Sequence, residues 1–266
     1  MMDRVVFIPA RHASTRYPGK PLVPLRGATG QAKSLIRRSW EAACAVRGID
    51  AVYVLTDDDR IAEEARGFGA GVLMTSSRAR NGTERCAEGL AQLETEPRVV
   101  LNLQGDAPLT PPWFLEALAG AMETAEPGGT GMATPVLRCD ARTLENFVTD
   151  RREGRVGGTT AVMRADGSAL YFSKEVLPFV GDLAAPPEVW HHVGVYAYTP
   201  GALRRYAGWP EGPLERAEGL EQLRFLENGL PVRCVPVEAR GRLFWELNNP
   251  VDVARIEAVL AEEGIA

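Results

Sequence analysis

Strand and helix patterns alternate along the first half of this 266-residue chain. Short apolar runs are followed by stretches whose apolar residues recur three and four positions apart, as is typical of strands and amphipathic helices. The expected strands are residues 5–9, 51–55, 71–74 and 98–103, and the expected helices are 34–47, 61–67, 83–93 and 112–125. Strands separated by helices require a mainly parallel sheet with helices on both faces. The pattern therefore predicts an α/β chain with a doubly wound sheet.

The second half of the chain has a different rhythm. The expected strands are residues 131–137, 159–164, 169–172 and 192–198, followed by a helix at 214–228, a strand at 232–237 and a final amphipathic helix at 249–263. Strands joined by turns favour a smaller mixed or antiparallel subsheet. Without long linkers or repeats, we expect one domain over residues 1–266, with a first half of about 1–130, a subdomain of about 131–240 and the C-terminal helix.

Composition excludes several classes of protein. The chain is 45% hydrophobic and 24% charged, with a formal net charge of -5, which argues against bulk binding to nucleic acid or to a membrane surface. Four widely spaced cysteines form no C-x-x-C pair, which favours free thiols in a reducing compartment over a zinc site. We find no signal peptide and no apolar run of membrane-spanning length. We therefore expect a cytoplasmic protein without nucleic-acid or membrane partners.

The first strand, at residues 4–10, leads into a basic loop at residues 11–22. This loop carries Arg11, Arg16 and Lys20, together with two hydroxyls and a Pro-Gly turn. Phosphate oxygens are bound by guanidinium forks, ammonium groups and free backbone N–H groups, and open α/β sheets bind ligands at the carboxyl ends of their strands. The loop matches neither a P-loop nor a dinucleotide fingerprint. The sequence predicts a site for a nucleotide triphosphate, although ordinary surface charges are the alternative.

An acidic turn, Gln104-Gly105-Asp106, follows the strand expected at 98–103. A carboxylate at a strand end can hold Mg²⁺ together with substrate phosphates, and Gly105 would allow the backbone to approach a ligand closely. Asp106 could equally cap a turn, and the spacing does not decide between the two. For the acidic run at 57–59, an N-cap of the next helix is the favoured interpretation.

Three weaker signals lie further along the chain. Residues 81–85 (NGTER) open a helix and could face a base or ribose, but they are also a good capping sequence. His191 and His192 could contact a substrate, although without partners they form no metal motif. Cys86, on a helix face, is expected in the core rather than as a nucleophile.

Six segments together resemble the CMP-ulosonate synthetase family, above all its branch that activates 3-deoxy-manno-octulosonate (Kdo): IPARHASTRYPGKPL, NGTER, LNLQGDAP, SALYFSK, HHVGVYAY and GPLERAEGLEQLR. The similarity runs nearly end to end. It implies a fold of the nucleotide-diphospho-sugar transferase type, CTP in the cleft above the sheet, Mg²⁺ as cofactor and a homodimer. It also implies CMP transfer from CTP to Kdo, with release of pyrophosphate, for lipopolysaccharide synthesis. The first half would then bind the nucleotide, and the subdomain would serve acceptor binding and dimerisation.

The resemblance implies residue roles by position. The residues expected at the triphosphate are Arg11, Ser14, Arg16 and Lys20, and those expected around cytosine and ribose are Ala10, Gly82, Thr83, Arg85 and Gln104. The acceptor residues would be His191, His192, Tyr196, Glu221 and Gln222, and the metal position would involve Asp106 and Asn248. Arg11, Lys20 and Asp106 would carry the catalytic step.

The chain departs from the family pattern at five positions. Asn81 stands where Ser is usual, Ala107 where Glu is usual, His191 where Arg is common and Thr160 where Lys is frequent, and Asn248 replaces an Asp that is a metal ligand in the family. These changes leave open whether one or two Mg²⁺ ions act. They also leave two alternatives: CMP transfer to another small acid (a related or amino-ulosonate, or a phosphonate), and a CTP-binding relative without catalysis.

Overall fold

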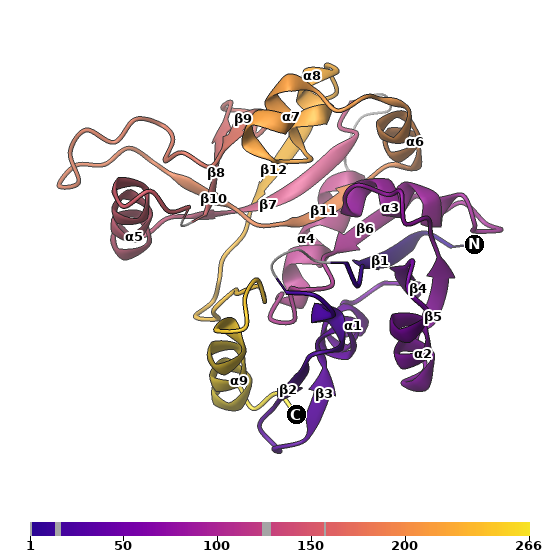
Figure 1. Ribbon diagram of the computed structural model, residues 1–266. Coiled ribbons are helices and arrows are strands. Elements are labelled where there is room, and N and C mark those ends of the chain that lie inside the picture. The colour runs from indigo at the N-terminus through magenta and orange to yellow at the C-terminus, as the bar shows by residue number, and fades with distance from the viewer. Residues whose placement is uncertain (1, 14–16, 124–128, 157) are drawn as a thin grey trace.

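A ten-stranded sheet runs through the computed structural model, which describes residues 2–13, 17–123, 129–156 and 158–266 (Figure 1). The strand order is β5-β4-β1-β6-β11-β7-β10-β8-β9, with β12 paired to β7. Helices lie on both faces of the sheet. This arrangement confirms the predicted α/β fold class.

The predicted parallel half is formed by four strands, β1 (Arg4–Ala10), β4 (Ala51–Thr56), β5 (Gly71–Met74) and β6 (Val99–Leu103). All three pairings among them are parallel. Because side chains alternate along a strand, β1 sends Val6 and Ile8 into one core cluster and Val5 and Phe7 into another. Both faces of this strand are therefore buried, as a parallel central strand requires.

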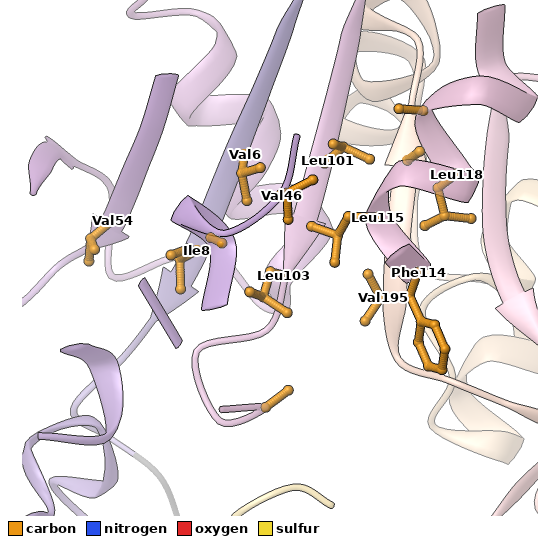
Figure 2. Close-up of a cluster of buried hydrophobic side chains, with 14 of the residues drawn as sticks. Val6, Ile8, Val46, Val54, Leu101, Leu103, Phe114, Leu115, Leu118 and Val195 are labelled. Atoms are coloured by element: carbon orange, nitrogen blue, oxygen red, sulfur yellow. The ribbon is translucent and has the colours of Figure 1, made fainter. Parts of the chain in front are cut away.

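Each face of the sheet is covered by its own helices. The first is covered by α1 (Leu35–Cys44), α2 (Asp59–Gly67) and α4 (Pro112–Glu123). Figure 2 shows Leu101 and Leu103 of β6 packed toward Leu115 and Leu118 of α4. The second face is covered by α3 (Gly82–Leu90), α6 (Pro200–Gly208) and α8 (Leu223–Glu227).

The predicted subsheet is present and continues directly from the parallel half. Its strands are β7 (Met132–Arg138), β8 (Thr159–Met163), β9 (Ala169–Ser173), β10 (Trp190–His192), β11 (Val195–Tyr198) and β12 (Val232–Pro236). The antiparallel pairing of β11 with β6 joins the two parts. Instead of the single strand expected at 192–198, the chain breaks at Val193–Gly194, so that β10 pairs with β8 while β11 pairs with β6.

The single helix predicted at 214–228 is wrong. The chain forms α7 (Pro213–Glu218) and α8, and Gly219 ends α7 with φ at 62°. Glycine takes this left-handed conformation without a steric penalty. The break places residues 220–222 in a loop between two short helices. A continuous apolar periodicity concealed this turn from the sequence.

Several elements have no counterpart among the predictions: the 3₁₀ turn η1 (Lys20–Leu22), the hairpin β2 (Pro24–Arg26) and β3 (Ala32–Ser34), and the helices α5 (Ala141–Arg152) and α6. The helix α5 buries only Leu144 and Phe147, so it offers little apolar periodicity. No helix within the described ranges is both long and apolar enough to cross a membrane.

The predicted C-terminal helix is confirmed as α9 (Asp252–Glu262). Its Ile256 and Leu260 pack with Leu25 of β2 and with Leu247 in a third core cluster. The N–H of Leu247 donates a hydrogen bond to the carbonyl oxygen of Asp106, 2.9 Å away. The segment before α9 is thus held against the acidic turn that follows β6.

Candidate functional site

A cleft of about 420 Å³ opens at the carboxyl ends of β1 and β6, which is where open α/β sheets bind ligands. Its volume lies in the range of small-molecule sites. Five parts of the chain line it besides Tyr196 of β11: residues 9–11 after β1, 20–21 in η1, 79–82 with Arg85 at the start of α3, 104–106 after β6 and 219–222 between α7 and α8. The cleft therefore brings together most of the segments expected to bind nucleotide and acceptor.

A cation and a carboxylate meet in this cleft. Lys20 Nζ lies 2.6 Å from Asp106 Oδ2, and the two side chains are 12% and 26% exposed. Arg11 also lines the cleft and is exposed to solvent, whereas Ser14 and Arg16 lie outside the described residues. The basic loop and the acidic turn, 86 residues apart in the chain, thus converge as the sequence predicted.

Two glycines allow close approach at the base of the cleft. A Cβ atom on Gly105 would lie 2.8 Å from the carbonyl oxygen of Pro9, and one on Gly82 would lie 2.9 Å from Gln104 Nε2. The backbone contact at Gly105 excludes a side chain there, whereas a side chain at Gly82 would displace the end of Gln104. Gln104 therefore packs directly over Gly82, and both turns lie against the end of β1, beside Ala10.

The segment at 81–85 caps a helix, and its Asn81, Gly82 and Arg85 line the cleft, whereas Thr83 is buried beneath it. Asn81 Oδ1 accepts the N–H of Glu84 at 2.9 Å, as the capping interpretation predicts. The N–H of Thr83 donates to Glu221 Oε2 at 3.0 Å, and the Thr83 hydroxyl lies 2.7 Å from that of Tyr198. Thr83 thereby ties the start of α3 to the loop between α7 and α8.

Arg85 is a buried cation in the wall of the cleft, only 3% exposed. It hydrogen-bonds the Thr75 hydroxyl and lies 3.4 Å from Asp57 Oδ1. Asp58 is the N-cap of α2 and accepts the N–H of Arg60 at 3.0 Å. The N-cap interpretation of the acidic run is confirmed at Asp58, while Asp57 forms an ion pair with Arg85.

Another part of the wall is formed by Tyr196, Glu221 and Gln222. The Tyr196 hydroxyl donates to Gln222 Oε1 at 3.5 Å. Gln222 is 1% exposed, and its Nε2 has no hydrogen-bond partner among the described residues. Burial raises the pKa of Glu221 above its usual value. The wall therefore combines an unused donor with a carboxyl group whose pKa is raised by burial.

His191 and His192 are not among the residues that line the cleft. His191 packs edge-on against Phe147, with ring centroids 5.1 Å apart. His192 lies 3.0 Å from the Thr134 hydroxyl through Nε2, and its ring is 5.7 Å from that of Tyr196. Burial lowers the pKa of His191 to about 4 and that of His192 to about 3. Both imidazoles are therefore neutral near pH 7, and their contact with an acceptor stays a prediction.

These lowered pKa values predict a loss of stability in acid. The stability that comes from burying neutral imidazoles is fully present above the unfolded pKa, near 6.5, and is lost as pH falls toward 4 and 3. Because one pKa unit corresponds to about 1.4 kcal/mol, His191 contributes on the order of 3 kcal/mol to this loss. Urea titrations at pH 7, 5.5 and 4 test this. Between pH 7 and pH 4, we expect the free energy of unfolding to fall less in His191→Phe than in the wild type. An equal fall in both proteins would contradict the prediction.

The residues present fit a bound Mg²⁺ ion by the chemistry of their donor atoms. The Asp106 carboxylate already accepts a cation, Lys20, and the bond from Leu247 brings the segment of Asn248 to the same turn. Among the residues that the structure describes, no three His, Cys, Asp or Glu side chains form a metal site. Mg²⁺ commonly uses one or two carboxylates together with substrate phosphates.

Sequence reasoning missed Glu246, a half-buried carboxylate near this position. Its Oε2 accepts the Asn248 side-chain amide at 3.5 Å, and its Oε1 would lie 3.2 Å from a Cβ on Gly194. It also helps to raise the pKa of Tyr196, for which burial is the main cause. No motif surrounds Glu246, so only the three-dimensional structure reveals its position.

Comparisons with known proteins match nearly the whole chain. The cytidylyltransferase family matches residues 5–234. A 3-deoxy-manno-octulosonate cytidylyltransferase of Maricaulis maris is 40% identical over 265 residues, covering 99% of each chain, and one of Zea mays is 37% identical, covering 98% of this chain and 82% of the relative. Among solved structures, a CMP:2-keto-3-deoxy-manno-octonic acid synthetase complexed with CTP superposes with a TM-score of 0.83 at 30% identity, covering 98% and 99% of the two chains.

Proposed function

The chain belongs to the cytidylyltransferase family, and on that basis we propose that it transfers CMP from CTP to Kdo and releases pyrophosphate. The single observation that carries this proposal is the cleft in which Lys20, Asp106 and the loop at 219–222 meet. It offers a cation for phosphates, a carboxylate for a metal and a polar wall for an acidic sugar. The relatives that share the sequence from end to end are named for the same reaction.

The reaction needs charge neutralisation rather than a nucleophile from the protein. The oxygen of the anomeric hydroxyl of Kdo would bond to the α-phosphorus of CTP, and the bond from that phosphorus to the oxygen bridging to the β-phosphate would break. Pyrophosphate would leave with the bridging oxygen, and the hydroxyl proton would pass to water. Lys20 and Arg11, with Arg16 of the same loop, would stabilise the negative charge that develops on the phosphates. Gln104, Gly82 and the N-terminus of α3 would surround the base and ribose.

We propose Mg²⁺ as the cofactor, held by Asp106 with Asn248 beside it. When bound, the ion would neutralise phosphate charge and lower the pKa of the attacking hydroxyl. Asn248 offers an amide oxygen, which carries no formal charge and therefore adds nothing to the charge that Asp106 supplies. The ion would share the Asp106 carboxylate with Lys20, whose Nζ lies 2.6 Å from Asp106 Oδ2.

On the acceptor side, the proposed contacts are Tyr196, Glu221 and Gln222, with the His192 ring 5.7 Å from that of Tyr196 and His191 packed against Phe147. The unpartnered Nε2 of Gln222 is suited to a carboxylate or hydroxyl oxygen of the sugar acid, since a buried donor without a partner destabilises the protein. Thr160 is buried, and its hydroxyl donates to the carbonyl oxygen of Glu175 at 2.7 Å. The position at which Lys is frequent in the family is therefore occupied by a buried residue of the sheet.

A pyrophosphate-release assay with CTP and a panel of acids tests this function. We expect release with Kdo and none when UTP replaces CTP. Release only with an amino-ulosonate, a related ulosonate or a phosphonate would favour the alternative acceptor. If CTP binds in calorimetry but no acid gives release, the chain would be a non-catalytic relative.

We also propose a homodimer in the cytoplasm, a location that suits the four free cysteines. The segment between β9 and β10 projects from the body of the molecule (Figure 1), and it exposes Phe179 by 86% and Leu183 by 41%. Large exposed apolar side chains on a projecting segment are typical of protein interfaces. The proposed partner is a second copy of this chain.

A charge at Phe179 is expected to dissociate this dimer. Phe179→Asp would bury a carboxylate in an apolar contact, which is strongly unfavourable. Light scattering coupled to gel filtration should then give the monomer mass, while the wild type gives twice that mass. Val251→Asp is the matched control, because Val251 is 79% exposed but lies beside α9. Equal masses for wild type and Phe179→Asp would contradict the assignment of this segment.

A further inference from the structure

A closed ring of hydrogen bonds lies behind the cleft and joins four helices. Arg224 of α8 donates to both oxygens of Glu215 in α7, at 2.6 and 2.7 Å, and to Glu84 Oε1 in α3 at 2.9 Å. The N–H of Glu84 donates to Asn81 Oδ1 at 2.9 Å, and Asn81 Nδ2 donates to the Tyr206 hydroxyl at 2.8 Å. Tyr206, in α6, closes the ring by donating to Glu215 Oε1 at 3.4 Å.

The charges in this ring are almost completely shielded from water. The side chains of Arg224 and Glu215 are 1% and 5% exposed, and that of Glu84 is 12% exposed. The guanidinium of Arg224 also lies 4.1 Å from the centre of the Tyr206 ring. Desolvating such groups offsets much of their mutual attraction. Stability alone therefore explains this arrangement poorly, whereas the two-pronged bond of Arg224 defines one geometry.

The ring encloses the junction between the two sides of the cleft. Asn81 borders the cleft on the side proposed for the nucleotide. The loop at 219–222 lies between the two ring members Glu215 and Arg224, and it borders the acceptor side. Inside the ring, the N–H of Thr83 reaches Glu221 Oε2 at 3.0 Å. Moving Arg224 would therefore change how this loop sits against the start of α3.

We propose that Arg224 is a positioning residue that holds the loop at 219–222 in one place relative to the start of α3, and so fixes the acceptor side of the cleft against the nucleotide side. Arg224 itself does not line the cleft; it acts through Glu84 and Glu215. The assignment of the two sides of the cleft to acceptor and nucleotide rests on the proposed function, whereas the link between the loop at 219–222 and α3 does not. Arg224 is also the last residue of the GPLERAEGLEQLR segment. The proposed chemistry gives it no other role.

Two variants test the link without removing a buried charge. Arg224→Lys keeps the cation but loses the planar fork, and Tyr206→Phe removes only the hydroxyl that joins Asn81 to Glu215. In both, we expect amide hydrogen exchange to accelerate at residues 81–85 and 219–224, while the slow amides of β1 and β6 keep their rates. Since small displacements of reacting groups can lower rates by about 10²-fold, we expect kcat/KM for Kdo to fall by about that factor in Arg224→Lys. The dissociation constant of CTP should change far less.

Arg204→Lys serves as the control, because Arg204 is 57% exposed and pairs with Glu96 on the surface. Uniformly faster exchange throughout the protein would show that Arg224 only stabilises the fold, and would overturn the proposal. So would variants that match the control in both exchange and kcat/KM. If the wild type releases no pyrophosphate with any acid, the proposed function fails, and the exchange pattern alone still decides whether Arg224 holds the loop.

Discussion

Replacing Lys20 with alanine is expected to lower kcat by about 10²–10³-fold, which is the typical effect of losing one preorganised group that stabilises transition-state charge. Lys20 is 12% exposed in the cleft and lies 2.6 Å from Asp106. Its ammonium group is thus held where developing phosphate charge would be stabilised. The measurement is pyrophosphate release at saturating CTP and Kdo.

The fold should survive this change. The pair with Asp106 is partly exposed, and such pairs contribute about 1 kcal/mol or less, so the urea midpoint should move little. Lys33→Ala is the control: Lys33 bonds Glu41 at 3.0 Å and is not among the residues that line the cleft. We expect this control to keep a rate close to that of the wild type. A wild-type rate in Lys20→Ala would show that the basic loop takes no part in the reaction.

The parallel half of the fold was predictable because its signals are local. The strands β1, β4 and β6 are mostly apolar, and buried strands between helices admit few arrangements. The breaks at Gly194 and Gly219 were not predictable, since both interrupt sequences that read as one strand and one helix. At Gly194, the break depends on the neighbouring strands, because β11 pairs with β6 whereas β10 pairs with β8. Pairing partners are a tertiary property that periodicity does not record.

The same distinction holds in the cleft. The meeting of Lys20 and Asp106 was predictable because the basic loop follows β1 and the acidic turn follows β6, and strand ends converge at one edge of a parallel sheet. The ring around Arg224 was not, since Arg224 and its partner Glu84 are 140 residues apart and neither follows a strand. Glu246 was missed for the same reason. The resemblance contributed Glu221 and Gln222, whose position in a loop depends on the unpredicted turn at Gly219.

Replacing Asp106 with asparagine is expected to have an effect as large as the loss of Lys20, through a different cause. Asparagine keeps the shape of the side chain but removes the charge that would hold a hard cation, and Mg²⁺ depends on carboxylate ligands. We expect kcat to fall by about 10²–10³-fold. Titration with Mn²⁺ in place of Mg²⁺, followed by electron paramagnetic resonance in the presence of CTP, should show much weaker binding of the ion.

Two further variants separate a metal role of Asp106 from a general effect of charge. Asp59→Asn removes an exposed carboxylate in the first turn of α2 and should leave Mn²⁺ affinity unchanged. Asn248→Asp adds a charge in the segment that Leu247 holds against Asp106, and it should strengthen Mn²⁺ binding in the wild-type background. If Asp106→Asn binds Mn²⁺ as tightly as the wild type, the carboxylate acts on Lys20 alone. Its loss would then change the orientation of that ammonium group, and the reaction would depend on the basic loop for most of its charge stabilisation.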